Sequence, residues 1–191
     1  MFQFSTLFIL FALFIHSGNG KPTTHCDPLY TLPRMTECLS ILSRINDAIK
    51  NSSRLNKEQK QKYQEDCVSM QSCKSVFECT GGPQEELETV FRGLKVQCKS
   101  GTFLMTEFKK CDQKMMAQNT TWQNPFPKFE KAEDALEQIK HGSTRKCEEL
   151  FTEGDALREN VLNICGKTDW EKLRKVLLET AEASRFCQMD S

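Results

Sequence analysis

The chain has 191 residues, of which 26 are Lys or Arg and 26 are Asp or Glu, so its formal net charge is zero, and it has ten cysteines. A neutral chain lacks the positive field that nucleic acid or an anionic membrane needs from a binding protein, so both are excluded as the main partner. The length suits one domain, or two small ones.

The N-terminal segment predicts secretion. Thr6 to Ile15 is an uncharged apolar run of ten residues, which is too short for the roughly 20 residues that span a bilayer. Gly18 and Gly20 follow at the spacing that a signal peptidase prefers, so we expect a signal peptide over residues 1–20 with cleavage after Gly20. No second apolar stretch approaches membrane length. We therefore expect residues 21–191 to be secreted and extracellular, without stable membrane insertion.

All the cysteines lie in the secreted part, and an even number in an oxidising compartment predicts that all are bridged. The sequence leaves the pairing open. A metal site would favour close pairs such as Cys-x-x-Cys, which are absent, and only His25 and His141 remain after cleavage, so we expect no metal ligand set. The cysteines are Cys26, Cys38, Cys67, Cys73, Cys79, Cys98, Cys111, Cys147, Cys165 and Cys187.

Apolar residues recur at three- and four-residue spacing, which favours an all-α fold, a disulfide-stapled bundle of about six or seven helices. The first helix is expected over Pro33 to Lys50, with the proline in its first turn. Its apolar face comprises Met35, Cys38, Leu42, Ile45 and Ile49. A second helix should begin after Asn56, with Gln59 as the capping-box partner, and end at Gly81. Its apolar residues are Tyr63, Cys67, Met70 and Phe77.

The next two helices are separated at Lys99-Ser100-Gly101. The third should begin near Glu85 and Glu86, where carboxylates favour a helix N-terminus rather than acid/base catalysis. Its apolar stripe comprises Leu87, Val90, Phe91, Leu94 and Cys98, and the fourth helix should carry Leu104, Phe108, Cys111 and Met115. The loop 119–128 follows, and it is the candidate boundary if the single domain 21–191 has two lobes.

Three more helices are expected. One covers Phe129 to Lys140, and another covers Thr144 to Cys165, which Gly154 loosens or divides. Along an unbroken helix Cys147 and Cys165 would lie about 27 Å apart, so they cannot pair with each other. The last helix should have Thr168 as its N-cap. Its stripe comprises Trp170, Leu173, Leu177, Thr180, Ser184 and Cys187, and Cys187 should bridge to an earlier helix.

Two sequons, Asn51-Ser52-Ser53 and Asn119-Thr120-Thr121, lie where the helical pattern breaks, so we expect N-glycans at Asn51 and Asn119. Catalytic motifs are missing. Gly166-Lys167-Thr168 resembles the end of a phosphate-binding loop, but Val161 occupies the position where that loop needs glycine. A Gly-x-Ser-x-Gly elbow is also absent. We expect neither an enzyme nor a cofactor.

Two segments carry a family resemblance: Gly101 to Cys111, and Cys165 to Arg174 with its Cys-Gly-x-x-x-Trp core. Together with the cysteines from Cys67 to Cys98, they resemble a family of nematode secreted cysteine-rich proteins built on a domain of unknown function. The resemblance covers about Cys26 to Cys187 and implies an extracellular module bonded by disulfides, with no activity attached. The family pattern implies another cysteine near Ala156, which this chain lacks, so its partner should be missing too.

Two functions fit these observations. The first is a secreted interaction module, a rigid helical scaffold that binds another extracellular macromolecule, such as a protein, or serves in the host or environmental interface, through surface loops. The second is a carrier of a small apolar ligand. Its cavity would be lined by Phe91, Leu94, Phe108, Trp170 and Leu177. An enclosed apolar cavity of a few hundred Å³ would favour the carrier, and a solid core would favour the interaction module.

Overall fold

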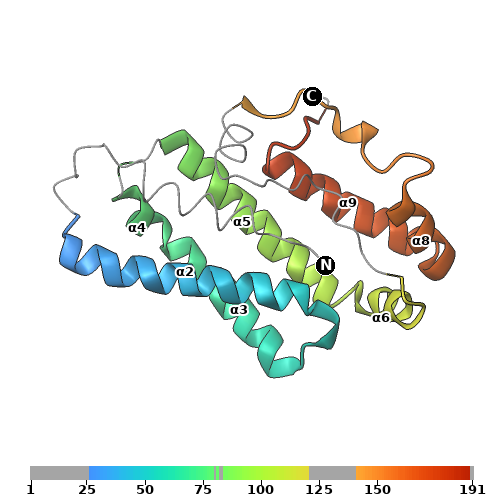
Figure 1. Ribbon diagram of the computed structural model, residues 1–191, viewed down its shortest axis with the longest axis horizontal. Helices are drawn as coiled ribbons and strands as arrows, with labels where there is room; N and C mark the ends of the chain where they lie inside the picture. The colour runs from blue at the N-terminus through green and yellow to red at the C-terminus, as the bar shows by residue number, and fades with distance from the viewer. Residues whose placement is uncertain (1–25, 80, 82–83, 121–140, 190–191) are drawn as a thin grey trace.

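A computed structural model describes residues 26–79, 81, 84–120 and 141–189. The predicted signal peptide, the predicted helix over 129–140 and most of the 119–128 loop lie outside these residues. The described part of the chain is all-helical, as expected, and Figure 1 shows its helices packed side by side. Its only strand-like feature is an isolated bridge between Lys146 and Gln188. No helix in these ranges is long and apolar enough to cross a membrane.

The α-helices and the two short 3-10 helices follow one another along the chain. They are α2 (Pro28–Lys50), η1 (Ser52–Arg54), α3 (Lys57–Ser72), α4 (Lys74–Glu78), α5 (Gln84–Met105), α6 (Lys109–Ala117), η2 (Cys147–Glu149), α8 (Ala156–Cys165) and α9 (Lys167–Ala183). Helix α5 runs through the middle of the molecule and packs against α3 on one side and α9 on the other.

Helix α2 begins five residues earlier than expected. The Asp27 carboxylate accepts a hydrogen bond of 2.9 Å from the Leu29 backbone N–H, and a proline stands at the first helical position. Proline has no N–H to leave unsatisfied there, so this pair starts the helix well. Pro33 therefore lies inside the helix, and the prediction that it stands in the first turn is wrong. The predicted apolar face is buried: Met35, Cys38, Leu42, Ile45 and Ile49.

Helix α3 confirms the capping box. The Gln59 N–H donates to the Asn56 side chain at 2.8 Å, and the Asn56 N–H donates to the Gln59 side chain at 2.9 Å. The helix does not continue to Phe77 as predicted, because it breaks at Cys73, and α4 follows as a separate element. Cys73 is buried and bonded to Cys38 of α2, which fixes the chain at the break.

Helix α5 continues through Gly101, where the sequence predicted a boundary. A Cβ atom at this position would lie 2.0 Å from the Tyr63 hydroxyl oxygen, closer than two atoms can approach. That hydroxyl donates a 3.0 Å hydrogen bond to the Cys98 carbonyl, and burial raises the pKa of Tyr63. Gly101 thus makes room for a ring from α3 and does not end the helix. Leu104 belongs to α5, and the predicted fourth helix is reduced to α6.

The predicted helix over Thr144 to Cys165 is interrupted. Cys147 lies in the short η2, and α8 begins only after Gly154, whose φ of 87° favours glycine, and the N-cap Asp155. The Asp155 side chain accepts hydrogen bonds from the backbone N–H groups of Leu157 and Arg158 at 2.9 and 3.1 Å. The predicted helix is therefore wrong before Gly154, where only the 3-10 helix η2 forms, and correct from Ala156 to Cys165.

Helix α9 begins at Lys167, so Thr168 is not its N-cap. Gly166 occupies that position with φ of 90°, and this conformation turns the chain from α8 into α9 within one residue. The helix ends at Ala183, so Ser184 and Cys187 lie beyond it. The rest of the predicted stripe is buried, as expected for a core face: Trp170, Leu173, Leu177 and Thr180.

Candidate functional site

All ten cysteines are paired, which confirms the expected five disulfides. The pairs are Cys26–Cys79, Cys38–Cys73, Cys67–Cys98, Cys111–Cys165 and Cys147–Cys187. Cys147 and Cys165 each bond to another partner, as the sequence required. No cysteine is left free, so the set closes without the additional family cysteine near Ala156.

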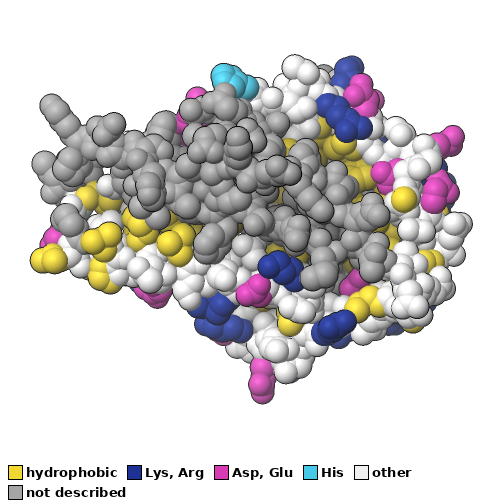
Figure 2. All heavy atoms as spheres, in the orientation of Figure 1, with side chains coloured by type: hydrophobic (Ala, Val, Ile, Leu, Met, Phe, Trp, Pro, Cys, Tyr) yellow, Lys and Arg dark blue, Asp and Glu magenta, His cyan; other side chains and the backbone are white. Residues whose placement is uncertain are grey.

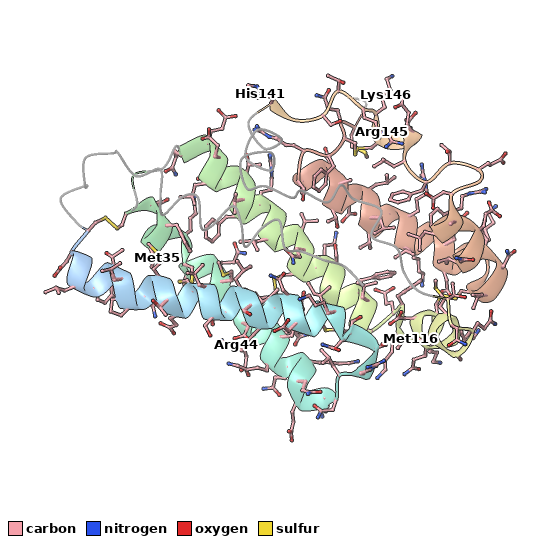
Figure 3. The ribbon with its side chains drawn as sticks, viewed as in Figure 1. Met35, Arg44, Met116, His141, Arg145 and Lys146 are labelled. Carbon is pink, nitrogen blue, oxygen red and sulfur yellow. A yellow bond between two sulfur atoms is a disulfide. The ribbon has the colours of Figure 1, made fainter. Side chains whose placement is uncertain are left out.

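The pairing divides the chain into two cross-linked parts, whose sulfur bridges appear in yellow in Figure 3. Three bridges join cysteines within residues 26–98, and one joins cysteines within residues 147–187. The bridge from Cys111 on α6 to Cys165 at the end of α8 is the only disulfide that joins the part of the chain up to α6 to the part that begins at Cys147. Sequence reasoning could not find this arrangement, because pairing depends on which helices pack together.

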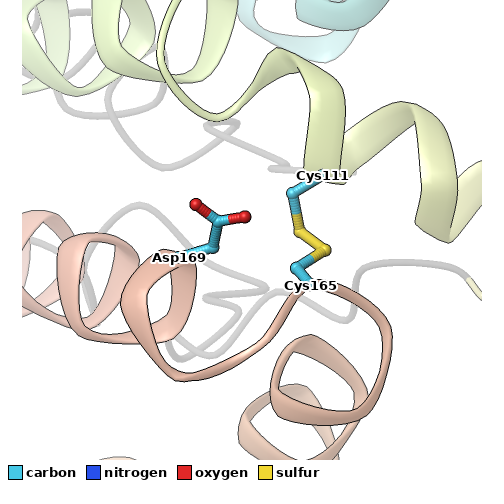
Figure 4. A group of neighbouring side chains, drawn as sticks. All are labelled: Cys111, Cys165 and Asp169. Carbon is cyan, nitrogen blue, oxygen red and sulfur yellow. A yellow bond between two sulfur atoms is a disulfide. The ribbon is translucent and has the colours of Figure 1, made fainter.

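An acidic side chain lies beside this connecting bridge. The Asp169 carboxylate in the first turn of α9 and the sulfur atoms of Cys111 and Cys165 all lie within 4.8 Å of one another. Figure 4 shows the carboxylate facing the sulfur–sulfur bond across the turn between α8 and α9. Two thiolates and a carboxylate could ligate a metal ion, but these sulfurs are bonded to each other, so they offer no thiolate.

The two sequons lie close together at one end of the molecule. Asn51 is exposed at the C-cap of α2, and Asn119 is exposed just after α6. The Ser53 hydroxyl donates a 3.2 Å hydrogen bond to the sulfur of Met116, and the Asn119 N–H donates to the Met116 carbonyl at 3.1 Å. Met116 is labelled beside the loop that follows α2 in Figure 3. Occupied sequons would place both glycans around this corner.

A partly buried ion pair joins α2 to α3. The Arg44 guanidinium donates two hydrogen bonds, 2.9 and 2.7 Å long, to the carboxylate of Asp66, which Lys62 approaches at 3.4 Å. Burial alone would raise the pKa of Asp66, but these cations outweigh burial and lower that pKa. A paired carboxylate that stays ionised has little use as a general acid or base, so this cluster is structural.

The residues proposed to line an apolar cavity lie in the core of the described part of the chain. The five residues proposed to line it, Phe91, Leu94, Phe108, Trp170 and Leu177, all belong to one continuous core. The Trp170 ring meets Phe151 edge-on, with 6.1 Å between the ring centroids. A hollow between α5 and α9 has a volume of about 10 Å³, about the space of one water molecule.

A wider cleft of about 600 Å³ lies between α5 and the C-terminal residues. Its described lining includes both apolar side chains and charged ones, among them Arg92, Glu182 and Arg185. The Arg185 guanidinium is bonded to Glu85 at 3.0 Å. An open cleft with charged walls is poorly suited to an apolar ligand.

The first five residues of α2 include three large apolar side chains that are exposed. The side chains of Leu29, Tyr30 and Leu32 are 86%, 68% and 62% exposed, and we call them the apolar tip. Figure 2 shows hydrophobic side chains gathered at the left edge, where α2 begins. Sequence reasoning missed the tip because it started the helix at Pro33. The Asp27-Pro28 pair, a capping residue followed by proline at the first helical position, was the signal that could have found it.

These features define a class: an all-helical protein in which every cysteine is a cross-link. The chain belongs to the family described as Domain of unknown function (DUF19), whose sequence model matches residues 26–188. This range begins at the first cysteine and ends one residue after the last, and it confirms the family resemblance.

Two similar proteins come from Caenorhabditis elegans. "Excretory canal abnormal exc-13" is 26% identical over 145 residues, which cover 72% of this chain and 70% of that protein. "UPF0376 protein F10G2.1" is 24% identical over 123 residues, which cover 62% of this chain and 60% of that protein. No solved structure matches the chain.

Proposed function

We propose that this protein is a secreted, glycosylated interaction module that binds another extracellular protein through its apolar tip. The exposure of Leu29, Tyr30 and Leu32 on a disulfide-fixed helix end carries the proposal. The apolar N-terminal segment and the five disulfides support secretion. The module would act by binding rather than by catalysis.

The tip is large enough to matter for binding. Its three side chains expose roughly 400 Å² of mainly apolar surface, a size that on a monomer often marks an interaction site. This is about half of what each partner buries in a stable complex of standard size. The tip would therefore be the anchor of a larger interface. Tyrosine suits such a place, because its ring buries well and its hydroxyl remains available for a hydrogen bond.

The shape and charge of the tip define the partner. Successive helical residues point about 100° apart, so Leu29, Tyr30 and Leu32 lie within an arc of about 160° on one side of the helix and form a convex surface. The basic residue nearest to the tip in sequence, Arg34, is paired with Glu37 at 2.6 Å, and Asp27 adds an acid, so these residues offer little attraction to anionic lipid. A protein with a concave apolar pocket is the partner that fits, in the manner of a helix docking into a groove.

The disulfides would hold the tip ready for binding. Cys26 lies immediately before the tip and is bonded to Cys79, while Cys38 is bonded to Cys73 two turns further along α2. A surface that is already ordered loses less conformational entropy on binding. The second candidate, an apolar carrier, has less support, because the residues proposed to line its cavity are core side chains and the hollow described between α5 and α9 has a volume of only about 10 Å³.

Photo-crosslinking from position 30 tests the proposal. A benzophenone amino acid replaces Tyr30 in one variant and Val68 in another, since Val68 is an isolated apolar side chain, 75% exposed, on α3. In extracellular fluid of the source organism, a defined adduct is expected from position 30 and not from position 68. Affinity for the purified partner should then fall at least tenfold in Leu29→Ser/Leu32→Ser and stay unchanged in Val68→Ser. Equal crosslinking at both positions, or equal affinity of both variants, would refute the proposal.

A further inference from the structure

The only disulfide that joins the part of the chain up to α6 to the part that begins at Cys147 is also the one with a carboxylate beside its sulfurs. Asp169 lies within 4.8 Å of both sulfur atoms of the Cys111–Cys165 bridge. Among the described His, Cys, Asp and Glu side chains, this is the only group of three that lies so close together. The carboxylate and the bridge therefore form a unit that the proposed binding function does not use.

Extracellular reduction of a disulfide begins with a thiolate. The thiolate sulfur bonds to one bridge sulfur, the sulfur–sulfur bond breaks, and the other cysteine leaves as a thiolate, so one disulfide and one thiolate exchange for another such pair. Cys165 is partly exposed and Cys111 is 2% exposed, so the incoming sulfur reaches Cys165 and Cys111 leaves. Negative charge thus arrives at one sulfur and develops on the other, and both are near Asp169.

We infer that the negative charge of Asp169 slows the reduction of the Cys111–Cys165 bridge by anionic thiols. The carboxylate repels the incoming thiolate, and it also disfavours the charge that appears on the buried Cys111 sulfur. Solvent and salt screen this repulsion, so the Asp169 carboxylate slows reduction of the bridge by roughly three- to tenfold rather than preventing it. Its effect is to keep the two parts of the extracellular module joined.

Timed reduction of the whole secreted protein tests this inference. Two thiols are applied separately at pH 8. Glutathione carries a net negative charge even before its thiol ionises, and cysteamine carries a positively charged ammonium group. Quenched samples are alkylated, and mass spectrometry of peptides gives the reduction rate of each bridge. In Asp169→Asn, glutathione should reduce Cys111–Cys165 roughly three- to tenfold faster than in the parent, with the other four bridges unchanged as internal controls. With cysteamine, whose ammonium group offsets the repulsion of its thiolate, the reduction rate of this bridge in Asp169→Asn should rise by a smaller factor than with glutathione.

The matched control is Glu171→Gln. Glu171 lies in the same turn of α9 and is paired with Lys167 at 3.7 Å, so its removal takes the same charge from the same helix N-terminus. In Glu171→Gln, the rate at which glutathione reduces Cys111–Cys165 should stay within about twofold of the rate in the parent. Salt gives a test without any mutation. Added salt screens the charge of Asp169, so it should raise the rate of glutathione attack on Cys111–Cys165 more than on the other four bridges. Equal rates in Asp169→Asn and the parent, or equal acceleration of all five bridges, would overturn the inference.

Discussion

At the scale of single residues, Trp170 shows how a large side chain anchors the C-terminal helix. It is 5% exposed and meets the Phe151 ring edge-on. Trp170→Ala removes an indole from a packed core, so we expect the free energy of unfolding to fall by about 3–5 kcal/mol, with lower secretion. Thermal unfolding measures the loss. A melting temperature within about two degrees of the parent would instead place Trp170 at a binding surface.

Gly101 offers a second prediction at this scale. Gly101→Ala should destabilise the protein by about 1–3 kcal/mol despite the better helix propensity of alanine, because its methyl group collides with the Tyr63 ring. Urea unfolding measures the cost. The matched control is Gly93→Ala in the same helix, where the nearest atoms to a new Cβ lie 3.8 Å away. That variant should be neutral or more stable, and equal losses at both positions would contradict the steric explanation.

The scale of the elements is where helix termini decide stability. Asn56→Ala removes the observed side-chain cap of α3, so we expect a loss of about 1 kcal/mol in chemical unfolding. Thr168→Ala is the matched control, because Thr168 resembles a cap in sequence but lies inside α9, exposed and without a capping bond. It should change stability by less than about 0.5 kcal/mol. The opposite order of the two losses would mean that the helix starts are wrongly placed.

Helix stripes and the Asn56 cap could be predicted from sequence because both depend on neighbours within a few positions. The helix boundaries that were wrong depend on distant contacts. In sequence Gly101 resembles a helix end, and only its contact with Tyr63 of α3 shows that glycine is needed there for space. The break at Cys73 coincides with a disulfide to α2. The apolar tip was missed for a different reason, because Pro33 was also a reasonable first-turn residue.

At the scale of the whole molecule, the redox state follows from the pairing. We expect the secreted protein to show no adducts when it is alkylated without reduction, because all five bridges are formed. Intact-mass analysis checks this. Reduction before alkylation is the positive control and should add ten labels, one for each cysteine. Two or more labels without reduction would contradict the pairing. The sequence predicted that all cysteines pair, but only the packing of the helices determined which ones.

Glycosylation is the second prediction for the whole molecule. Asn51 and Asn119 are exposed at helix ends, so both should carry glycans when eukaryotic cells secrete the protein. Glycosidase treatment should lower the apparent mass, and Asn51→Gln and Asn119→Gln should each remove part of that shift. If the treated and untreated proteins migrate together, the prediction of the compartment or of the accessibility of these sites is wrong.

The division of the bridges also sets an order of events during synthesis. A chain made from its N-terminus exposes Cys26 to Cys98 first, and these six cysteines contain all three of their own pairs. They can close before Cys165 leaves the ribosome. After Cys111 is added, the ribosome must add 54 more residues to reach its partner Cys165, which takes roughly 3–10 s at ordinary translation rates. The first part of the chain can therefore be oxidised and packed before the ribosome has finished the second.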